Sequence, residues 1–135
     1  MERKIVHVVG TGTIGEPLIG ILCEQRSNLG IDEVTFHKQT PLTKDAPKIK
    51  NLMAKGARLS VHEDRVESFK EIGLEPEFTM EEAVSRSSVV IDCTPKGFGH
   101  KNKLDFYEKY SDKVKGFLAQ GSEDGFGKKY ARGIN

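Results

Sequence analysis

The stretch IVHVVGTGTIG, residues 5–15, determines the fold class. Its first half, Ile5 to Val9, is a short apolar run rich in β-branched residues, which is typical of a strand buried on both faces of a parallel sheet. Its second half carries glycines at positions 10, 12 and 15, in the spacing G-x-G-x-x-G. Apolar residues then recur at helical spacing, so a helix is expected from about Gly15 to Ser27.

The three glycines suit a strand–loop–helix unit that binds a dinucleotide. Gly10 permits the tight turn, Gly12 lets a pyrophosphate approach the backbone, and Gly15 lets the helix pack close to the strand. The amides of Thr13 and Ile14 would then lie at a helix N-terminus and point toward the phosphates. A tight turn that binds nothing is the alternative. We interpret the loop as a site for NAD or NADP.

The rest of the chain alternates strands with helices. Strands are expected over residues 34–37, 57–61, 77–78, 88–92 and 116–119, and helices over 48–55, 65–72, 80–86 and 101–110. Pro41 and Pro47 are expected to interrupt the polar stretch between residues 38 and 47. The pattern predicts an α/β fold, a Rossmann-type doubly wound and largely parallel sheet with helices on both faces. We expect residues 1–135 to form a single domain.

Composition excludes several classes of protein. The chain has 21 Lys and Arg against 20 Asp and Glu, a net charge of +1, so no general footprint for nucleic acid or for an anionic membrane is expected. No apolar run approaches the roughly 20 residues of a membrane span. Two cysteines without a Cys-x-x-Cys motif favour neither a disulfide framework nor a metal site, and a cytoplasmic location is expected.

The titratable residues outside the glycine loop do not form a catalytic set in the sequence. We expect Cys23 to be a core residue of the first helix, and His7 to be a satisfied strand histidine. Cys93, at the end of a strand, is the better nucleophile, but its only candidate base is His100, and packing is the favoured role. His62 is interpreted as part of a solvated helix entry.

The end of the second strand bears on the choice between NAD and NADP. An NAD-binding unit usually carries Asp or Glu about 20 residues past the glycines, where it binds the ribose 2′-hydroxyl. Residues 35–40 read TFHKQT and contain no acid, while Asp32 and Glu33 lie at the opposite end of the strand. Lys38 can neutralise a 2′-phosphate, with His37 and Thr40 as further donors. NADP is therefore the preferred cofactor and NAD the second, and a solvated role for Lys38 is the alternative.

Together with the glycine loop, the later segments resemble one family. The stretch DCTPKGFGHKN, residues 92–102, is similar to the D-x-T-P-x-G-x-G-x-K-N segment of archaeal-type phosphorylating glyceraldehyde-3-phosphate dehydrogenases. Residues 12–15, GTIG, are similar to that family's glycine loop, and Lys38 with Pro41 to its K-x-x-P. Residues 117–121, FLAQG, are similar to its strand ending in Q-G. The resemblance spans nearly the whole chain.

The resemblance implies a role for each matching position in binding the cofactor. Gly12, Thr13 and Ile14 would hold the pyrophosphate, and Lys38 would face the adenosine 2′-phosphate. Thr94, Pro95 and Gly97 would lie further along the cofactor, toward the nicotinamide, and Gln120 and Gly121 would lie near the cofactor at the carboxyl end of a strand. The family's full-length enzymes are expected to be homo-oligomers.

The sequence departs from the family at two points. Thr40 stands where the family often has Arg, and the family's nucleophilic cysteine, in an S-C-N-T-like segment beyond the first domain, is not in this chain. We therefore expect an NAD(P)-binding domain without its catalytic domain, which positions the dinucleotide for hydride transfer from an aldehyde phosphate and is inactive alone. The alternative is a free-standing, non-catalytic Rossmann module that senses a nucleotide or recruits a partner.

Overall fold

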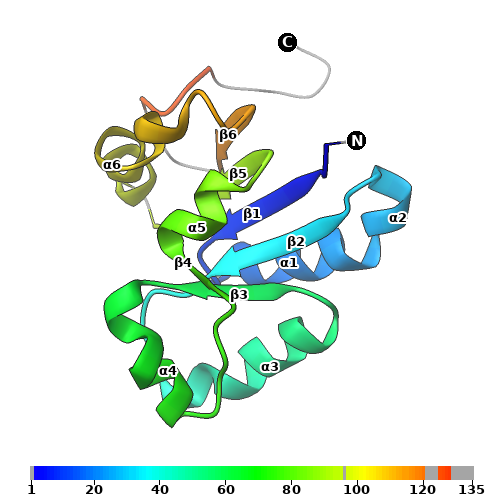
Figure 1. Cartoon of the computed structure of the whole chain (residues 1–135), viewed down its shortest axis with the longest axis vertical. Helices are drawn as coiled ribbons and strands as arrows, with labels where there is room; N and C mark the ends of the chain where they lie inside the picture. Colours follow the sequence, from blue (N-terminus) through cyan, green and yellow to red (C-terminus); the bar gives the residue numbers. More distant parts are fainter. Residues whose placement is uncertain (1, 96, 121–124, 129–135) are drawn as a thin grey trace.

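The computed structural model describes residues 2–95, 97–120 and 125–128. These residues form one six-stranded sheet with the strand order β4-β3-β2-β1-β5-β6 (Figure 1). The strands are β1 (Ile5–Val9), β2 (Glu33–His37), β3 (Arg58–Val61), β4 (Phe78–Thr79), β5 (Val89–Asp92) and β6 (Gly116–Ala119). Every neighbouring pair is parallel, which confirms the predicted doubly wound α/β fold. The described sheet is wholly parallel.

Helices cover both faces of the sheet. They are α1 (Gly15–Glu24), α2 (Arg26–Leu29), α3 (Ala46–Ala54), α4 (Val66–Glu71), α5 (Met80–Ser85) and α6 (Phe98–Asp105), with 3-10 turns η1 (Thr43–Asp45), η2 (Glu63–Arg65) and η3 (Tyr107–Tyr110). In the described part of the chain, no helix combines the length and the apolar character needed to cross a membrane.

The two faces of the sheet have separate hydrophobic cores. Val8 packs in the larger core, with residues of α1, α3 and α4. Its neighbour Val9 packs in the smaller core, with Val84 of α5 and Tyr107 of η3. Because successive side chains of a strand point to opposite faces, α1, α3 and α4 cover one face, and α5 and η3 cover the other.

Three helices differ from the sequence-based expectation by more than a shift of one residue at an end. The first helix is divided at Gln25, whose backbone leaves the helical region at φ −97° and ψ 9°. Pro47 does not interrupt the chain but lies in the first turn of α3, where its missing N–H costs no helical hydrogen bond. The last helix begins at Phe98 rather than Lys101, directly after Gly97 with its φ of +91°, and continues into the separate turn η3.

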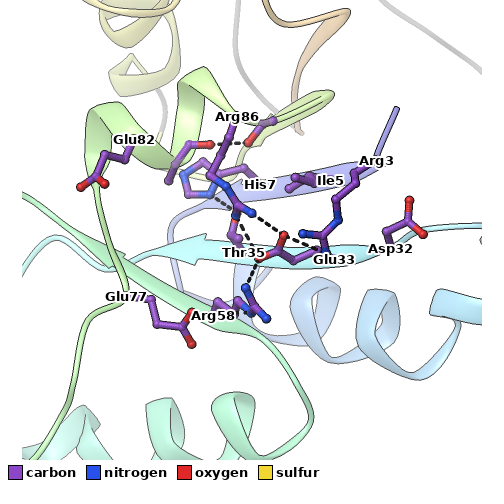
Figure 2. A network of polar contacts seen from close by, with 12 residues as sticks. Arg3, Ile5, His7, Asp32, Glu33, Thr35, Arg58, Glu77, Glu82 and Arg86 are labelled. Atoms are coloured by element: carbon purple, nitrogen blue, oxygen red, sulfur yellow. Dashed lines mark hydrogen bonds and ion pairs between the residues drawn. The ribbon is translucent and has the colours of Figure 1, made fainter. Parts of the chain in front are cut away.

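A buried carboxylate joins three arginines at the amino edge of the sheet. Glu33 is 2% exposed, and Arg86 donates to both of its oxygens at 2.9 and 2.7 Å. Arg58 lies 2.8 Å and Arg3 3.5 Å from the same carboxylate (Figure 2). Burial acts to raise the pKa of Glu33, but the bonds from Arg86 and the nearby arginine charges outweigh it, so the pKa is lowered. The network ties β2, β3, the end of α5 and the segment before β1 together.

Two histidines lie buried beneath α5, on the same face as Glu33. His7 Nδ1 is 2.7 Å from the Thr35 hydroxyl, and His37 Nδ1 is 3.1 Å from the Ser60 hydroxyl. His7 is only partly satisfied, contrary to the sequence-based expectation, because its Nε2 has no hydrogen-bond partner among the described residues. Burial lowers the pKa of His7 to about 3 and that of His37 to about 4.

These histidines make the stability of the chain depend on pH. Below the ordinary histidine pKa of 6.5 the unfolded chain binds protons that the folded chain does not, so the free energy of unfolding falls as the pH drops from 6.5 toward 4. Each histidine adds a slope that approaches about 1.4 kcal/mol per pH unit. Urea unfolding between pH 6.5 and 5 should show that His7→Leu and His37→Leu each reduce the slope. A slope that stays the same in both variants would contradict this account.

Candidate functional site

The centre of the carboxyl edge of the sheet is a topological switch point. From β1 the chain returns to β2 on one side, and later to β5 on the other. The loops that follow these strands therefore diverge, and ligands of open α/β sheets bind in the resulting crevice. At this point the Gly10 amide donates to the His37 carbonyl at 3.2 Å, and the Cys93 amide donates to the Val9 carbonyl at 2.8 Å.

The glycine loop contains two glycines that the fold requires and one that it does not. A Cβ atom on Gly15 would lie 2.0 Å from the Gly10 carbonyl oxygen, and one on Gly10 would lie 3.0 Å from the Cys93 carbonyl oxygen. Gly10 also has a φ of +107°. A Cβ on Gly12 would meet no atom within 4 Å. The backbone at Gly12 therefore borders open space, and a pyrophosphate fits this arrangement because it needs close access to the backbone there.

Residues on either side of Gly12 are arranged differently. Thr11 is buried, and its carbonyl accepts a hydrogen bond of 2.8 Å from Lys48 Nζ of α3. Thr13 and Ile14 are exposed and lie directly before α1. Lys48 thus connects the glycine loop to α3, a contact that sequence reasoning missed because it joins residues 37 positions apart.

Asp92 organises the loop that follows β5. One of its carboxylate oxygens accepts from the Thr94 amide at 2.9 Å and from the Thr94 hydroxyl. The other accepts from Asn102 Nδ2 at 3.0 Å and from the Tyr107 hydroxyl at 2.5 Å. Because Asp92 is 1% exposed, these bonds compensate for its lost hydration and hold the turn at Thr94 against α6 and η3.

A cavity of about 370 Å³ adjoins this loop, on the face of the sheet that α5 covers. Gly10, Thr94 and Pro95 line it, which brings two of the predicted segments together. Its other walls are mostly apolar, and they are Val9, His37, Gln39, Met80, Val84, Phe98, Lys101, Asn102, Phe106 and Tyr107. The size and apolar lining are those of a small-molecule site.

The surroundings of Lys38, at the end of β2, differ from those that the sequence indicated. Lys38 is not a solvated cation, because its side chain is 14% exposed and its ammonium group lies 2.9 Å from Asp45 Oδ2. The sequence window after β2 contains no acid, but η1 brings Asp45 to the same place. An acid seven positions beyond Lys38 gives no local sequence signal, because only the course of η1 brings it back.

Two of the predicted residues, Gly97 and Gln120, follow β5 and β6 in the described part of the chain. The Gln120 amide donates to the Asp92 carbonyl at 3.1 Å, so Gln120 follows β6 at the carboxyl edge. Gly97 is exposed and precedes α6, and a Cβ there would meet no atom within 4 Å. Gly121 lies outside the described residues. Neither Gly97 nor Gln120 lines the cavity of about 370 Å³.

Both cysteines are buried. Cys23 lies in α1 and packs in the larger core, as expected. Cys93 follows β5, and burial, with a smaller contribution from Asp92, raises the pKa of its thiol to about 11. At neutral pH the Cys93 thiol is therefore protonated, a state that does not favour nucleophilic chemistry.

Comparison with known proteins supports the family resemblance that the motifs indicated. The chain is 34% identical to the glyceraldehyde-3-phosphate dehydrogenase of Pyrobaculum arsenaticum, over 88% of this chain and 32% of that protein. It is 36% identical to that of Methanobacterium formicicum, over 78% of this chain and 30% of that protein. It is 43% identical to that of Methanopyrus kandleri, over 51% of this chain and 20% of that protein.

This chain is a relative of the archaeal glyceraldehyde-3-phosphate dehydrogenases. The resemblance inferred from its motifs is thereby confirmed. The chain spans about a third of the length of the first curated dehydrogenases that it matches. No protein-family model matches it.

The raised pKa of Cys93 predicts a slow thiol. Relative to the ordinary cysteine value of 9.0, a pKa of about 11 lowers the thiolate fraction at neutral pH about a hundredfold. In the folded chain, alkylation of Cys93 by iodoacetamide at pH 7.5, followed by peptide mass spectrometry, should be at least about a hundredfold slower than that of an ordinary cysteine. The same chain in urea should react at the ordinary rate. Rapid labelling of Cys93 in the folded chain would show an activated thiol.

Proposed function

We propose that this chain is the NADP- or NAD-binding domain of a glyceraldehyde-3-phosphate dehydrogenase-like oxidoreductase. In this role it orients the dinucleotide for hydride transfer from an aldehyde phosphate that a separate catalytic domain binds. The observation that carries the proposal is the contrast within the glycine loop, where packing requires Gly10 and Gly15 but leaves open space at Gly12. The similarity to archaeal dehydrogenases supports the same conclusion.

The proposed binding mode follows the crevice at the carboxyl edge. The pyrophosphate would lie at Gly12, where the backbone is open, near the amides of Thr13 and Ile14. The adenine ring suits the apolar cavity beside Gly10 and His37, which adjoins the end of β2. The nicotinamide half would extend past Thr94 and Pro95 toward Gly97 and Gln120. When bound, the nicotinamide ring supplies the hydride acceptor, and the residues of this chain supply its orientation.

The loop after β5 contributes preorganisation. Asp92 fixes the Thr94 amide and hydroxyl before any ligand arrives, so little backbone ordering remains for the binding event. Cys93 is a protonated, buried thiol, and we assign it no catalytic role. The preference for NADP over NAD is part of the proposal and rests on Lys38 at the end of β2.

Substitutions at two glycines separate ligand access from folding. We predict that Gly12→Val abolishes binding of NADPH and NADH, because the branched side chain would occupy the space for the pyrophosphate. Its free energy of unfolding should stay near that of the wild type, since a Cβ there meets no atom. Gly15→Ala should destabilise the chain, because its Cβ would clash with the Gly10 carbonyl. Dinucleotide titration and urea unfolding of both variants test this. Unchanged affinity in folded Gly12→Val would place the dinucleotide elsewhere.

Lys38 provides the test of cofactor preference. We predict that the chain binds NADPH more tightly than NADH, and that Lys38→Asp reverses the order. The substitution removes a cation from the 2′-phosphate and adds an acceptor for the 2′-hydroxyl. A charge-assisted bond of this kind contributes about 1.5–3 kcal/mol, or roughly tenfold to a hundredfold in affinity. Calorimetry that finds equal affinities in the wild type and no response to the substitution would reduce Lys38 to a structural cation.

A further inference from the structure

Lys38 is already engaged by a carboxylate of its own chain. Its ammonium nitrogen lies 2.9 Å from Asp45 Oδ2, and the two side chains are only 14% and 18% exposed. Water therefore screens this ion pair less than a pair on the open surface. Lys38 also lowers the pKa of Asp45, chiefly through their hydrogen bond, so the carboxylate is ionised at neutral pH.

A second lysine places this pair next to the glycine loop. Lys48 Nζ lies 3.9 Å from Asp45 Oδ1 and donates to the Thr11 carbonyl at 2.8 Å. Asp45 thus lies between two ammonium groups, one at the end of β2 and one at the glycine loop. The cluster has two positive charges and one negative charge, and it borders the place where the ribose of a bound dinucleotide would lie.

An anion that arrives at Lys38 must compete with Asp45. The 2′-phosphate of NADP would share the ammonium group with a carboxylate that also repels it, whereas the neutral 2′-hydroxyl of NAD meets neither cost. We propose that Asp45 is a positioning residue that restrains the preference for NADP over NAD by holding Lys38 in an ion pair. This inference rests on the proposed dinucleotide site and adds a specificity-determining residue to it.

The first experiment compares Asp45→Asn with the wild-type chain by fluorescence titration with NADPH and with NADH. Release of Lys38 should raise the affinity for NADPH about threefold to tenfold. The affinity for NADH should change less than twofold. Asp32→Asn is the matched control, because it removes the same charge at the opposite edge of the sheet, where Asp32 accepts from the Lys4 amide. It should leave both affinities unchanged.

The second experiment repeats Asp45→Asn in a Lys38→Met background. The gain in NADPH affinity should disappear there, because Asp45 acts through Lys38. An equal loss for both cofactors in Asp45→Asn would assign Asp45 a merely structural role, and a selective loss of NADPH affinity would show that Asp45 orients Lys38 for the phosphate. Either outcome, or a gain that persists without Lys38, would overturn the inference. Wild-type protein that binds neither cofactor would refute the proposed function and this inference with it.

Discussion

The candidate site depends on the close approach of Gly15, at the start of α1, to the Gly10 carbonyl at the end of β1. Gly15 approaches the Gly10 carbonyl so closely that no side chain fits between them, and Gly10 in turn lies against the Cys93 carbonyl. The first turn of α1, the end of β1 and the end of β5 are thereby brought to one point. These contacts fix the backbone at the switch point from which the loops diverge and the crevice opens.

Charge is used differently at the two edges of the sheet. At the amino edge Glu33 is surrounded by arginines and joins strands that are distant in sequence (Figure 2). At the carboxyl edge the carboxylate of Asp92 is held by neutral donors, and it shapes a loop rather than a core. A second carboxylate, Asp45, pairs instead with Lys38 and Lys48, and Lys48 also donates to the glycine loop. The carboxylate with three arginine partners thus lies at the edge far from the candidate site.

The periodicity of the sequence predicted the fold well, because the strands are short apolar runs and β6 matches its expected bounds, Gly116–Ala119. The helix expected over residues 80–86 is α5 (Met80–Ser85), and both bonds of a capping box at Thr79 form at its start. The surroundings of Lys38 were not predictable. They depend on the turn η1, which brings Asp45 back to the end of β2. The sequence next to Lys38 carries no pattern that predicts this ion pair. The start of α3 at Ala46 was predicted two residues too late, because proline is common both in loops and in first helical turns and Pro47 was assigned to the loop.

The position of β1 at the centre of the sheet has a consequence for synthesis of the chain. Its second neighbour, β5, follows far later, and the Ser88 hydroxyl that bonds the Ile5 amide is 83 positions away. A nascent chain that grows from its amino terminus therefore carries β1 and β2 with one edge of the central strand bare. Until β5 emerges from the ribosome, the unpaired N–H and C=O groups along that edge are open to pairing with strands of other chains, which favours aggregation in the interval.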